Sequence, residues 1–257
     1  MTDTSTGRFV WYDLMTTDTA AAIAFYTHVT GWTTQVYGGD SHYTMWVGAQ
    51  GPLGGTTTLP EAARKMGAPP HWISNVTVAD VDATVARVRE LHGTVHMEPE
   101  EIPEIGRFAV IADPHGASIA VFKPSRPMAP QDGERPGAFC WSELMTADHN
   151  AAFTFYAEIF GWEKVGTHDM GPMGEYLLFG RDGKSVGGMM TKPKEMPVSA
   201  WTYYVNVGDL DAAIERARSR DARLLNGPMP IPGGGRIAQL VDPQGAMFAL
   251  LGAGEAK

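Results

Sequence analysis

The chain has 257 residues, enough for one large or two ordinary domains, and its 44% hydrophobic and 19% charged residues are typical of a globular protein. A net charge of −9 without any run of Lys or Arg argues against a nucleic-acid partner, because the phosphate backbone requires clustered cations. The N-terminus lacks the pattern of an export signal, no segment approaches a membrane span, and the single Cys140 excludes an intramolecular disulfide, so we expect a cytoplasmic protein without a membrane partner.

The first elements of the chain are predicted from alternation and capping residues. Residues 9–15 alternate as a strand, and Asp18 is placed to cap a helix that ends at Gly31. Three short strands separated by Gly-rich turns follow, in the segments "WTTQVYG", "YTMWVGA" and "PLGGTTT". The same order then returns: a strand in "WISNVTV", a helix from Asp80 to about Leu91, and strands in "TVHME", "FAVIAD" and "SIAVFK". The pattern therefore predicts a β-α-β-β-β unit, written twice.

The second half of the chain repeats the first at an offset of about 130 residues. Residues 11–32 and 141–162 are identical at 11 of 22 positions without a gap, and later segments match in the same order. A repeat of this kind indicates a tandem duplication. We predict a first domain at 1–123, a Pro-rich linker at 124–137 and a second domain at 138–257.

Four motifs indicate a family. The segments "FYTHVTGW" and "FYAEIFGW" close the first helix of each copy, and "DPHGASIAVF" and "DPQGAMFALL" lead into its last strand. In order and spacing the chain resembles the glyoxalase/bleomycin-resistance/extradiol-dioxygenase family, also known as the vicinal oxygen chelate superfamily. More narrowly, it is similar to two-domain actinobacterial proteins labelled glyoxalase or hydroxylase. The resemblance covers residues 8–123 and 138–252 and implies an α+β fold, in which paired units form curled, cup-like mixed sheets around a cavity.

The resemblance also implies positions for metal ligands, which here hold other residue types. Those positions fall on Trp11, Ile73 and Ala120 in the first copy and on Trp141, Thr202 and Ala249 in the second. An acid that some members add corresponds to the Gly-Gly pairs at 54–55 and 187–188. Trp, Ile and Ala offer no electron pair to a divalent ion, and a Thr hydroxyl is a poor substitute for imidazole. We therefore expect no metal cofactor at the usual positions.

A displaced metal site is an alternative. His71 shares the strand parity of Ile73, and together with His42 and Asp13 it could form a His-His-carboxylate site. Histidines that are exposed or hydrogen-bonded near turns would explain the same residues. Ala200 replaces His71 in the second copy, so such a site would be confined to the first.

The inward faces of the strands are predicted to line the two cups with mostly aromatic and apolar side chains. Such a lining is typical of a small-molecule pocket and suits a planar or hydrophobic ligand. We expect ligand contacts from Trp11, Tyr43, Met45, Asn75 and Phe108 in the first copy and from Trp141, Tyr176, Tyr204 and Asn206 in the second. The same side chains could instead fill each cup as core.

Asp13 and Glu143 are the candidate catalytic residues. An acid on an inward strand face is costly to bury unless it is paired or hydrogen-bonded. In an apolar pocket it could act as a general base or hold a cationic group, and alternatively it could bond backbone amides as a structural acid. Arg107 and Arg236, at the start of the penultimate strand of each copy, could either bind a ligand anion or pair with a nearby carboxylate.

Three classes of function remain open. The first is a metal-independent binder of a small aromatic or hydrophobic molecule, as the resemblance to drug-binding members implies. The second is an enzyme, a lyase, isomerase or dioxygenase-like protein that uses Asp13 and Glu143 or a displaced metal. The third is an interaction or regulatory protein with vestigial pockets. We expect a small-molecule partner and a monomer or homodimer.

Overall fold

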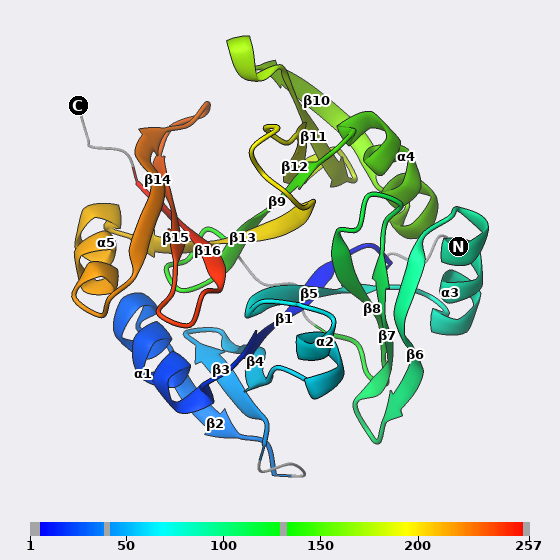
Figure 1. The fold of residues 1–257 in the computed structure, drawn as a ribbon, viewed down its shortest axis with the longest axis horizontal. Helices are drawn as coiled ribbons and strands as arrows, with labels where there is room; N and C mark the ends of the chain where they lie inside the picture. The colour runs from blue at the N-terminus through cyan, green and yellow to red at the C-terminus, as the bar shows by residue number, and fades with distance from the viewer. Residues whose placement is uncertain (1–5, 39–41, 129–132, 254–257) are drawn as a thin grey trace. The chain divides into compact units, whose positions relative to one another are not determined.

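Each sequence copy forms one eight-stranded mixed sheet in the computed structural model, which describes residues 6–38, 42–128 and 133–253. The first sheet has the order β2-β3-β4-β1-β5-β8-β7-β6 (Figure 1) and contains β1 (Phe9–Thr16), β2 (Thr33–Val36), β3 (Thr44–Gly48), β4 (Gly51–Thr58), β5 (His71–Thr77), β6 (Thr94–Ile102), β7 (Gly106–Ala112) and β8 (Ser118–Pro124). The second has the equivalent order β10-β11-β12-β9-β13-β16-β15-β14 and contains β9 (Phe139–Thr146), β10 (Glu163–Asp169), β11 (Glu175–Arg181), β12 (Lys184–Thr191), β13 (Ala200–Gly208), β14 (Arg223–Pro230), β15 (Arg236–Val241) and β16 (Met247–Gly252). This topology confirms the predicted α+β fold of tandem β-α-β-β-β units.

Each β-α-β-β-β unit contains one parallel strand pair. The first strand of each β-α-β-β-β unit runs parallel to its last strand, as in β1 with β4 and β5 with β8. The second copy repeats this arrangement in β9 with β12 and β13 with β16. The other neighbouring strands within a β-α-β-β-β unit are antiparallel, as in β2 with β3 and β3 with β4. A parallel pair needs a long crossover connection, and the helix supplies part of it.

The helices begin and end where the capping residues predict. They are α1 (Thr19–Thr30), α2 (Glu61–Lys65), α3 (Val81–Glu90), α4 (His149–Phe160) and α5 (Leu210–Arg218), with a 3-10 turn η1 at Gly171–Met173. The Asp18 carboxylate accepts from the Ala21 amide, and Gly31 ends α1 with a φ of +78°. Gly is favoured there because a side chain resists positive φ. Asp80 caps α3 in the same way, which confirms the predicted starts of both helices.

Two local features differ from the sequence prediction. The five-residue helix α2 lies in a segment for which no element was expected, because one turn after Pro60 carries no apolar periodicity. Strand β6 continues to Ile102, past the predicted "TVHME" segment, although it contains Pro99. Proline is tolerated on edge strands, and β6 is the last strand of its sheet.

The chain divides into two compact units, and each takes residues from both sequence copies. Unit 1 comprises residues 1–10, 73–130 and 142–201, and unit 2 comprises residues 11–72, 131–141 and 202–257. Unit 1 thus combines the second half of the first copy with the first half of the second copy. The domain boundaries predicted above follow the repeat in the sequence, and residues 129–132 of the predicted linker lie outside the described residues.

Both units have an aromatic core of the same design. In unit 2 the cluster contains Tyr26, Trp32, Trp46, Trp72 and Phe139, and in unit 1 the equivalent positions hold Tyr156, Trp162, Phe179, Trp201 and Phe9. The rings of Tyr26 and Trp72 meet edge to face at 5.1 Å, and those of Tyr156 and Trp201 at 5.3 Å. Such pairs contribute about 0.5–1.5 kcal/mol each beyond the area that they bury. Each core therefore draws its aromatic residues from both copies.

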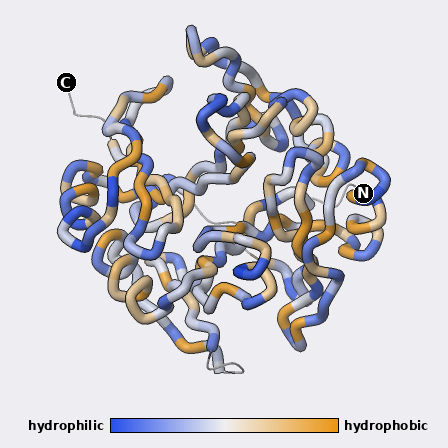
Figure 2. The backbone as a smooth tube through the Cα atoms, viewed as in Figure 1, coloured by the Kyte–Doolittle hydropathy of each residue, from blue (hydrophilic) through white to orange (hydrophobic). Residues whose placement is uncertain are grey.

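The helices are short, and two pairs of them pack together. Helix α1 packs on α5 within unit 2, and α3 packs on α4 within unit 1. Hydrophobic and hydrophilic residues are mixed along the backbone (Figure 2), and no helix of the described segments is long and apolar enough to span a bilayer.

Candidate functional site

Strand β1 has two faces with different environments. Val10, Tyr12 and Leu14 are buried, and Leu14 is fully so. Trp11 and Asp13, on the other face, are half-buried. Successive side chains of a strand point to opposite faces, so β1 gives one face to the core and leaves an aromatic ring and an acid on the other.

The carboxylate of Asp13 is held by two donors. The Tyr43 hydroxyl donates to Asp13 Oδ1. The indole Nε1–H of Trp11 donates to Tyr43 Oη at 2.6 Å and to Asp13 Oδ1 at 3.1 Å. Burial and the negative charge of Asp13 raise the pKa of the Tyr43 phenol far above its usual value. Tyr43 therefore keeps its proton at physiological pH and acts as a permanent donor to the acid.

Gly55 makes this contact possible. It lies beside Asp13 in the parallel register of β1 and β4. A Cβ atom at Gly55 would fall 2.1 Å from Cζ of Tyr43, so any other residue would collide with the ring that reaches across to Asp13. The preceding Gly54 has a different role, because a Cβ there would lie 1.9 Å from the carbonyl oxygen of Tyr12. The Gly-Gly pair thus permits close backbone packing and gives the tyrosine ring its space.

The second copy repeats this construction in unit 1. The Tyr176 hydroxyl donates to Glu143 Oε1 at 2.9 Å, and Glu143 is buried. Gly188 lies beside Glu143 in the register of β9 and β12, and a Cβ at Gly188 would fall 2.1 Å from Cε1 of Tyr176. Gly187 would collide with the Ser142 carbonyl oxygen at 2.2 Å. Both sequence copies therefore contain a carboxylate–tyrosine pair above a glycine, Asp13 with Tyr43 and Glu143 with Tyr176.

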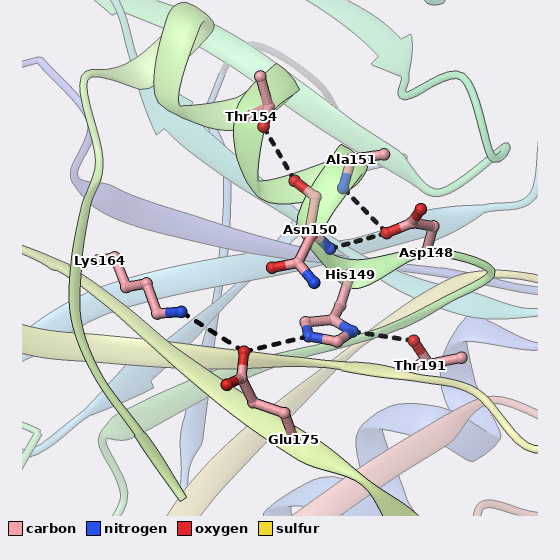
Figure 3. A network of polar contacts seen from close by, with 8 residues as sticks. All are labelled: Asp148, His149, Asn150, Ala151, Thr154, Lys164, Glu175 and Thr191. Carbon is pink, nitrogen blue, oxygen red and sulfur yellow. Dashed lines mark hydrogen bonds and ion pairs between the residues drawn. The ribbon is translucent and has the colours of Figure 1, made fainter.

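A network specific to the second copy adjoins its carboxylate–tyrosine pair (Figure 3). His149 is buried at the start of α4, with Nδ1 2.9 Å from Thr191 Oγ1 and Nε2 3.5 Å from Glu175 Oε1. Lys164 Nζ lies 3.4 Å from the same carboxylate oxygen. Glu175 immediately precedes Tyr176, so these contacts fasten the start of β11 to α4 and β10. The aligned positions of the first copy hold Thr19, His42 and Thr34 and cannot form this network.

The other predicted ligand-contacting residues are divided between the units. Met45 is half-buried on β3 in unit 2 and lies opposite Gly55 in the strand register. Asn75 and Phe108 belong to unit 1. Trp141, Tyr204 and Asn206 belong to unit 2, where Tyr204 Oη accepts from Gln239 at 2.8 Å and Asn206 donates to the Glu134 carbonyl at 2.8 Å. Within single units, the structure brings together Trp11, Asp13 and Tyr43, and Glu143 with Tyr176.

The alternative metal site does not form. His42 is exposed, and Nδ1 of His71 lies 2.8 Å from the carbonyl oxygen of Pro69. Among residues 6–38, 42–128 and 133–253, no three His, Cys, Asp or Glu side chains gather as a metal site would require. The prediction of a site made by His42, His71 and Asp13 is therefore wrong: a shared strand parity did not bring the side chains together.

Sequence reasoning missed a buried network that joins the two copies within one unit. The Tyr26 hydroxyl donates to Asp242 Oδ2 at 3.0 Å and accepts from Trp72 Nε1 at 2.9 Å. Asp242 Oδ1 accepts the backbone amides of Gln244 and Ala246 at 2.9 Å each. Burial raises the pKa of Asp242 and places that of Tyr26 well above its usual value. The tyrosine of the "FY" motif and the aspartate of the "DP" motif are thus structural partners.

The two arginines that could have held a ligand anion are already paired. Arg107 makes a bidentate contact with Asp82, with distances of 2.7 and 2.8 Å, and Arg236 makes the equivalent contact with Asp211 at 2.7 and 3.1 Å. Both are exposed pairs between a strand and the preceding helix. The geometry supports the pairing alternative for these residues.

Comparison with known proteins places the chain in a family. The family model described as "Glyoxalase/Bleomycin resistance protein/Dioxygenase superfamily" matches residues 8–121 and 139–250. The chain belongs to this superfamily. Among relatives within it, the chain is 33% identical over 247 residues to "Putative glyoxylase CFP32" of Mycobacterium tuberculosis, covering 94% of this chain and 93% of the relative. It is 30% identical over 264 residues to "Anthracycline biosynthesis protein DauV" of Streptomyces sp., covering 98% and 95%.

Solved structures of the superfamily share the fold. The 2,3-dioxygenase LapB from Pseudomonas sp. KL28 superposes with a TM-score of 0.65 at 13% identity, over 97% of this chain and 94% of that one. The Mn(II)-bound glyoxalase from Novosphingobium aromaticivorans superposes with a TM-score of 0.64 at 18% identity, over 96% and 82%. These matches confirm the predicted resemblance at the level of the fold.

The positions that the resemblance assigns to metal ligands hold side chains whose chemistry does not suit a divalent ion. The Trp11 indole nitrogen is a hydrogen-bond donor without a free electron pair, and it is used on Tyr43 and Asp13. Ile73, Ala120 and Ala249 are buried apolar side chains, and Thr202 is the only hydroxyl among the six positions. The Gly-Gly pairs, which aligned with an acid in some members, give space to tyrosine rings instead.

Proposed function

We propose that the protein binds a small aromatic or hydrophobic molecule on the faces that carry the two carboxylate–tyrosine pairs, without a divalent metal ion. The observation that supports this most strongly is the repetition of one construction: a carboxylate, a tyrosine that donates to it, and a glycine that gives the ring its place. In the first copy Trp11 and Met45 add half-buried apolar surface to the same unit. An aromatic wall with one fixed acid is the chemistry of a pocket that orients a flat ligand.

The acid determines which kind of ligand group it can bind. An ionised carboxylate only accepts hydrogen bonds, so its partner on the ligand is a hydroxyl, an N–H group or an ammonium group. Tyr43 remains protonated and its proton is directed at Asp13, which leaves the acid as the group that the pair offers. The name of the relative DauV supports a ligand of this kind, since anthracyclines are planar polycyclic aromatics that carry hydroxyls and an amine.

The second candidate is an enzyme of the same superfamily, a lyase, isomerase or dioxygenase-like protein in which Asp13 or Glu143 exchanges protons with the substrate. The relative named as a glyoxylase favours it. Against it, the Asp13 carboxylate is already engaged by hydrogen bonds from Tyr43 and Trp11. Binding without catalysis requires no such proton transfer. An interaction protein with vestigial pockets would need neither of the two carboxylate–tyrosine pairs.

A titration with daunorubicin tests the proposal. We expect saturable quenching of fluorescence in the wild type and weaker binding in Asp13→Asn and Glu143→Gln, each of which keeps the side-chain shape but removes the charge. Each variant reports on one copy, and the double variant reports on both. Unchanged affinity together with a lower melting temperature would leave the acids a structural role only.

Metal content separates the two candidates. The proposal predicts that purified protein carries no stoichiometric iron, zinc or manganese by mass spectrometry, and that a chelator leaves daunorubicin affinity unchanged. Stoichiometric metal, or affinity lost on chelation, would overturn it in favour of metal-assisted chemistry.

A further inference from the structure

Unit 1 contains a cleft whose lining includes no residue of either carboxylate–tyrosine pair. It has a volume of about 240 Å³ and lies where three segments meet: the start of β1, the end of β5 and the end of β8 with the residues that follow. Val10 and Val78 are buried and supply apolar surface, and Pro124, Pro127 and Met128 add more. Thr77 and Ser125 contribute hydroxyls.

The charged side chains of this cleft are all cationic. Arg8, Lys123 and Arg126 line it, and no Asp or Glu is among the described residues that do so. Within the described segments, none of the three side chains forms an ion pair or a hydrogen bond. This differs from Arg87 and Arg107 of the same unit, which bind Glu158 and Asp82.

Two acids that follow the β5 part of the cleft in sequence, Asp80 and Asp82, are engaged elsewhere. The Asp80 carboxylate accepts the Ala83 amide at 2.9 Å as the cap of α3. Asp82 is held by Arg107, whose hydrogen bonds and positive charge lower the pKa of that carboxyl. Within the described segments, the three cations therefore line one cleft without an acid committed to them, in a chain whose net charge is −9. Like charges that share a cleft repel one another, and an anionic ligand relieves that repulsion.

The equivalent place in the second copy is built differently. Ala138 and Gly252 stand where the first copy has Arg8 and Lys123. Asn206 stands at the position of Thr77, and its amide donates to the carbonyl oxygen of Glu134 in the segment between the copies. The cationic cleft is therefore a property of the first copy and not a consequence of the repeated fold.

We propose that this cleft binds a small organic anion, in which a carboxylate, sulfonate or phosphate group is joined to a compact apolar body. The cations hold the anionic group by charge-assisted hydrogen bonds, which are about twice as strong as neutral ones. The valines, prolines and methionine cover the apolar part. A neutral or cationic aromatic molecule would be bound at the carboxylate–tyrosine pairs instead. The cleft and the pairs would therefore differ in the ligand charge that they accept.

Calorimetric titration with 2-naphthalenesulfonate and 2-naphthol tests the proposal. The two probes share an aromatic body, and only the sulfonate is charged at pH 7. We expect the wild type to bind the sulfonate saturably, with an affinity that falls as salt is added. The double variant Lys123→Gln/Arg126→Gln should weaken sulfonate binding by about tenfold or more, because each tenfold step corresponds to about one charge-assisted contact. Both side chains are exposed, so the substitutions leave the core intact.

The control is Lys194→Gln/Arg220→Gln, which removes the same two charges at other exposed positions. Its sulfonate affinity should equal that of the wild type, and 2-naphthol binding should be unchanged in both double variants. Equal losses in the two double variants would mean that net charge and not the cleft attracts the probe, and would overturn the proposal. So would the absence of saturable sulfonate binding by the wild type. Neither result bears on daunorubicin binding at Asp13 and Glu143.

Discussion

The two carboxylate–tyrosine pairs share a plan but differ in their surroundings. In the first copy Asp13 is half-buried, and Trp11 donates both to it and to the tyrosine. In the second copy Glu143 is buried, and the network of His149, Glu175 and Lys164 fastens the strand that carries the tyrosine. The acid, the tyrosine and the glycine beneath it are common to both. The comparison indicates that these three residues define the proposed ligand site, while the contacts that support them have diverged.

The largest effect is expected at the shared glycines. Gly55→Ala and Gly188→Ala should each displace a tyrosine ring, destabilise the protein by about 1–3 kcal/mol as overpacking does, and weaken daunorubicin binding in the affected copy. Urea denaturation and the titration measure the two effects. Gly38→Ala is a matched control, because a Cβ there meets nothing within 4 Å. If Gly55→Ala proved as benign as Gly38→Ala, the ring would not need the space that the structure gives it.

A smaller difference is expected between the buried tyrosines of the two units. Tyr26→Phe leaves Trp72 Nε1 and Asp242 Oδ2 without the tyrosine hydroxyl and should cost about 1–3 kcal/mol. Tyr156 accepts from Trp201 at 3.1 Å and donates to the Ala117 carbonyl oxygen at 3.3 Å, and these two contacts are longer than those of Tyr26. Tyr156→Phe should therefore cost less in the same denaturation experiment. Equal losses would show that the two networks are energetically equivalent.

The buried aspartates predict a dependence of stability on pH. Burial raises the pKa of Asp113 and Asp242 in the folded state. Above the unfolded pKa of about 3.9, the folded state therefore holds more protons, and the free energy of unfolding falls as pH rises until the folded pKa is passed. Asp242→Asn should flatten this fall in denaturation curves recorded over that pH range. A fall that persists undiminished in both Asp113→Asn and Asp242→Asn would contradict the assignment.

The smallest effect is expected at the paired arginines. Arg107→Gln and Arg236→Gln each break an exposed bidentate ion pair, and such pairs contribute little because water and salt screen them. Neither variant should measurably change the melting temperature or daunorubicin affinity. A loss of ligand affinity in either would restore the alternative in which these arginines bind a ligand anion.

The fold was predictable because its signals are local or repeated. Asp18 and Gly31 mark the ends of α1 by their own backbone preferences, and the repeat of the whole pattern identified the duplication. The family resemblance depended on motifs within each copy. None of these signals depends on which distant segments meet.

The long-range contacts and the role of the glycines could not be predicted, because the spacing of residues in one sequence does not show which distant segments meet. The pairing of Tyr26 with Asp242 crosses 216 positions of the chain. Gly55 was interpreted as the position of a missing acid, whereas its importance lies in the Tyr43 ring that crosses it. One signal was available: in both copies a tyrosine stands within one residue of the start of the strand that turns back onto a Gly-Gly strand. The steric meaning of that pattern becomes apparent only when the strand register is known.

Affinity for daunorubicin in chelator-treated protein tests the central claim most directly. We expect the metal-free wild type to bind as tightly as untreated protein and the double variant Asp13→Asn/Glu143→Gln, with the fold intact by circular dichroism, to lose saturable binding. Full affinity in the folded double variant would show that the carboxylate–tyrosine pairs are not the ligand site.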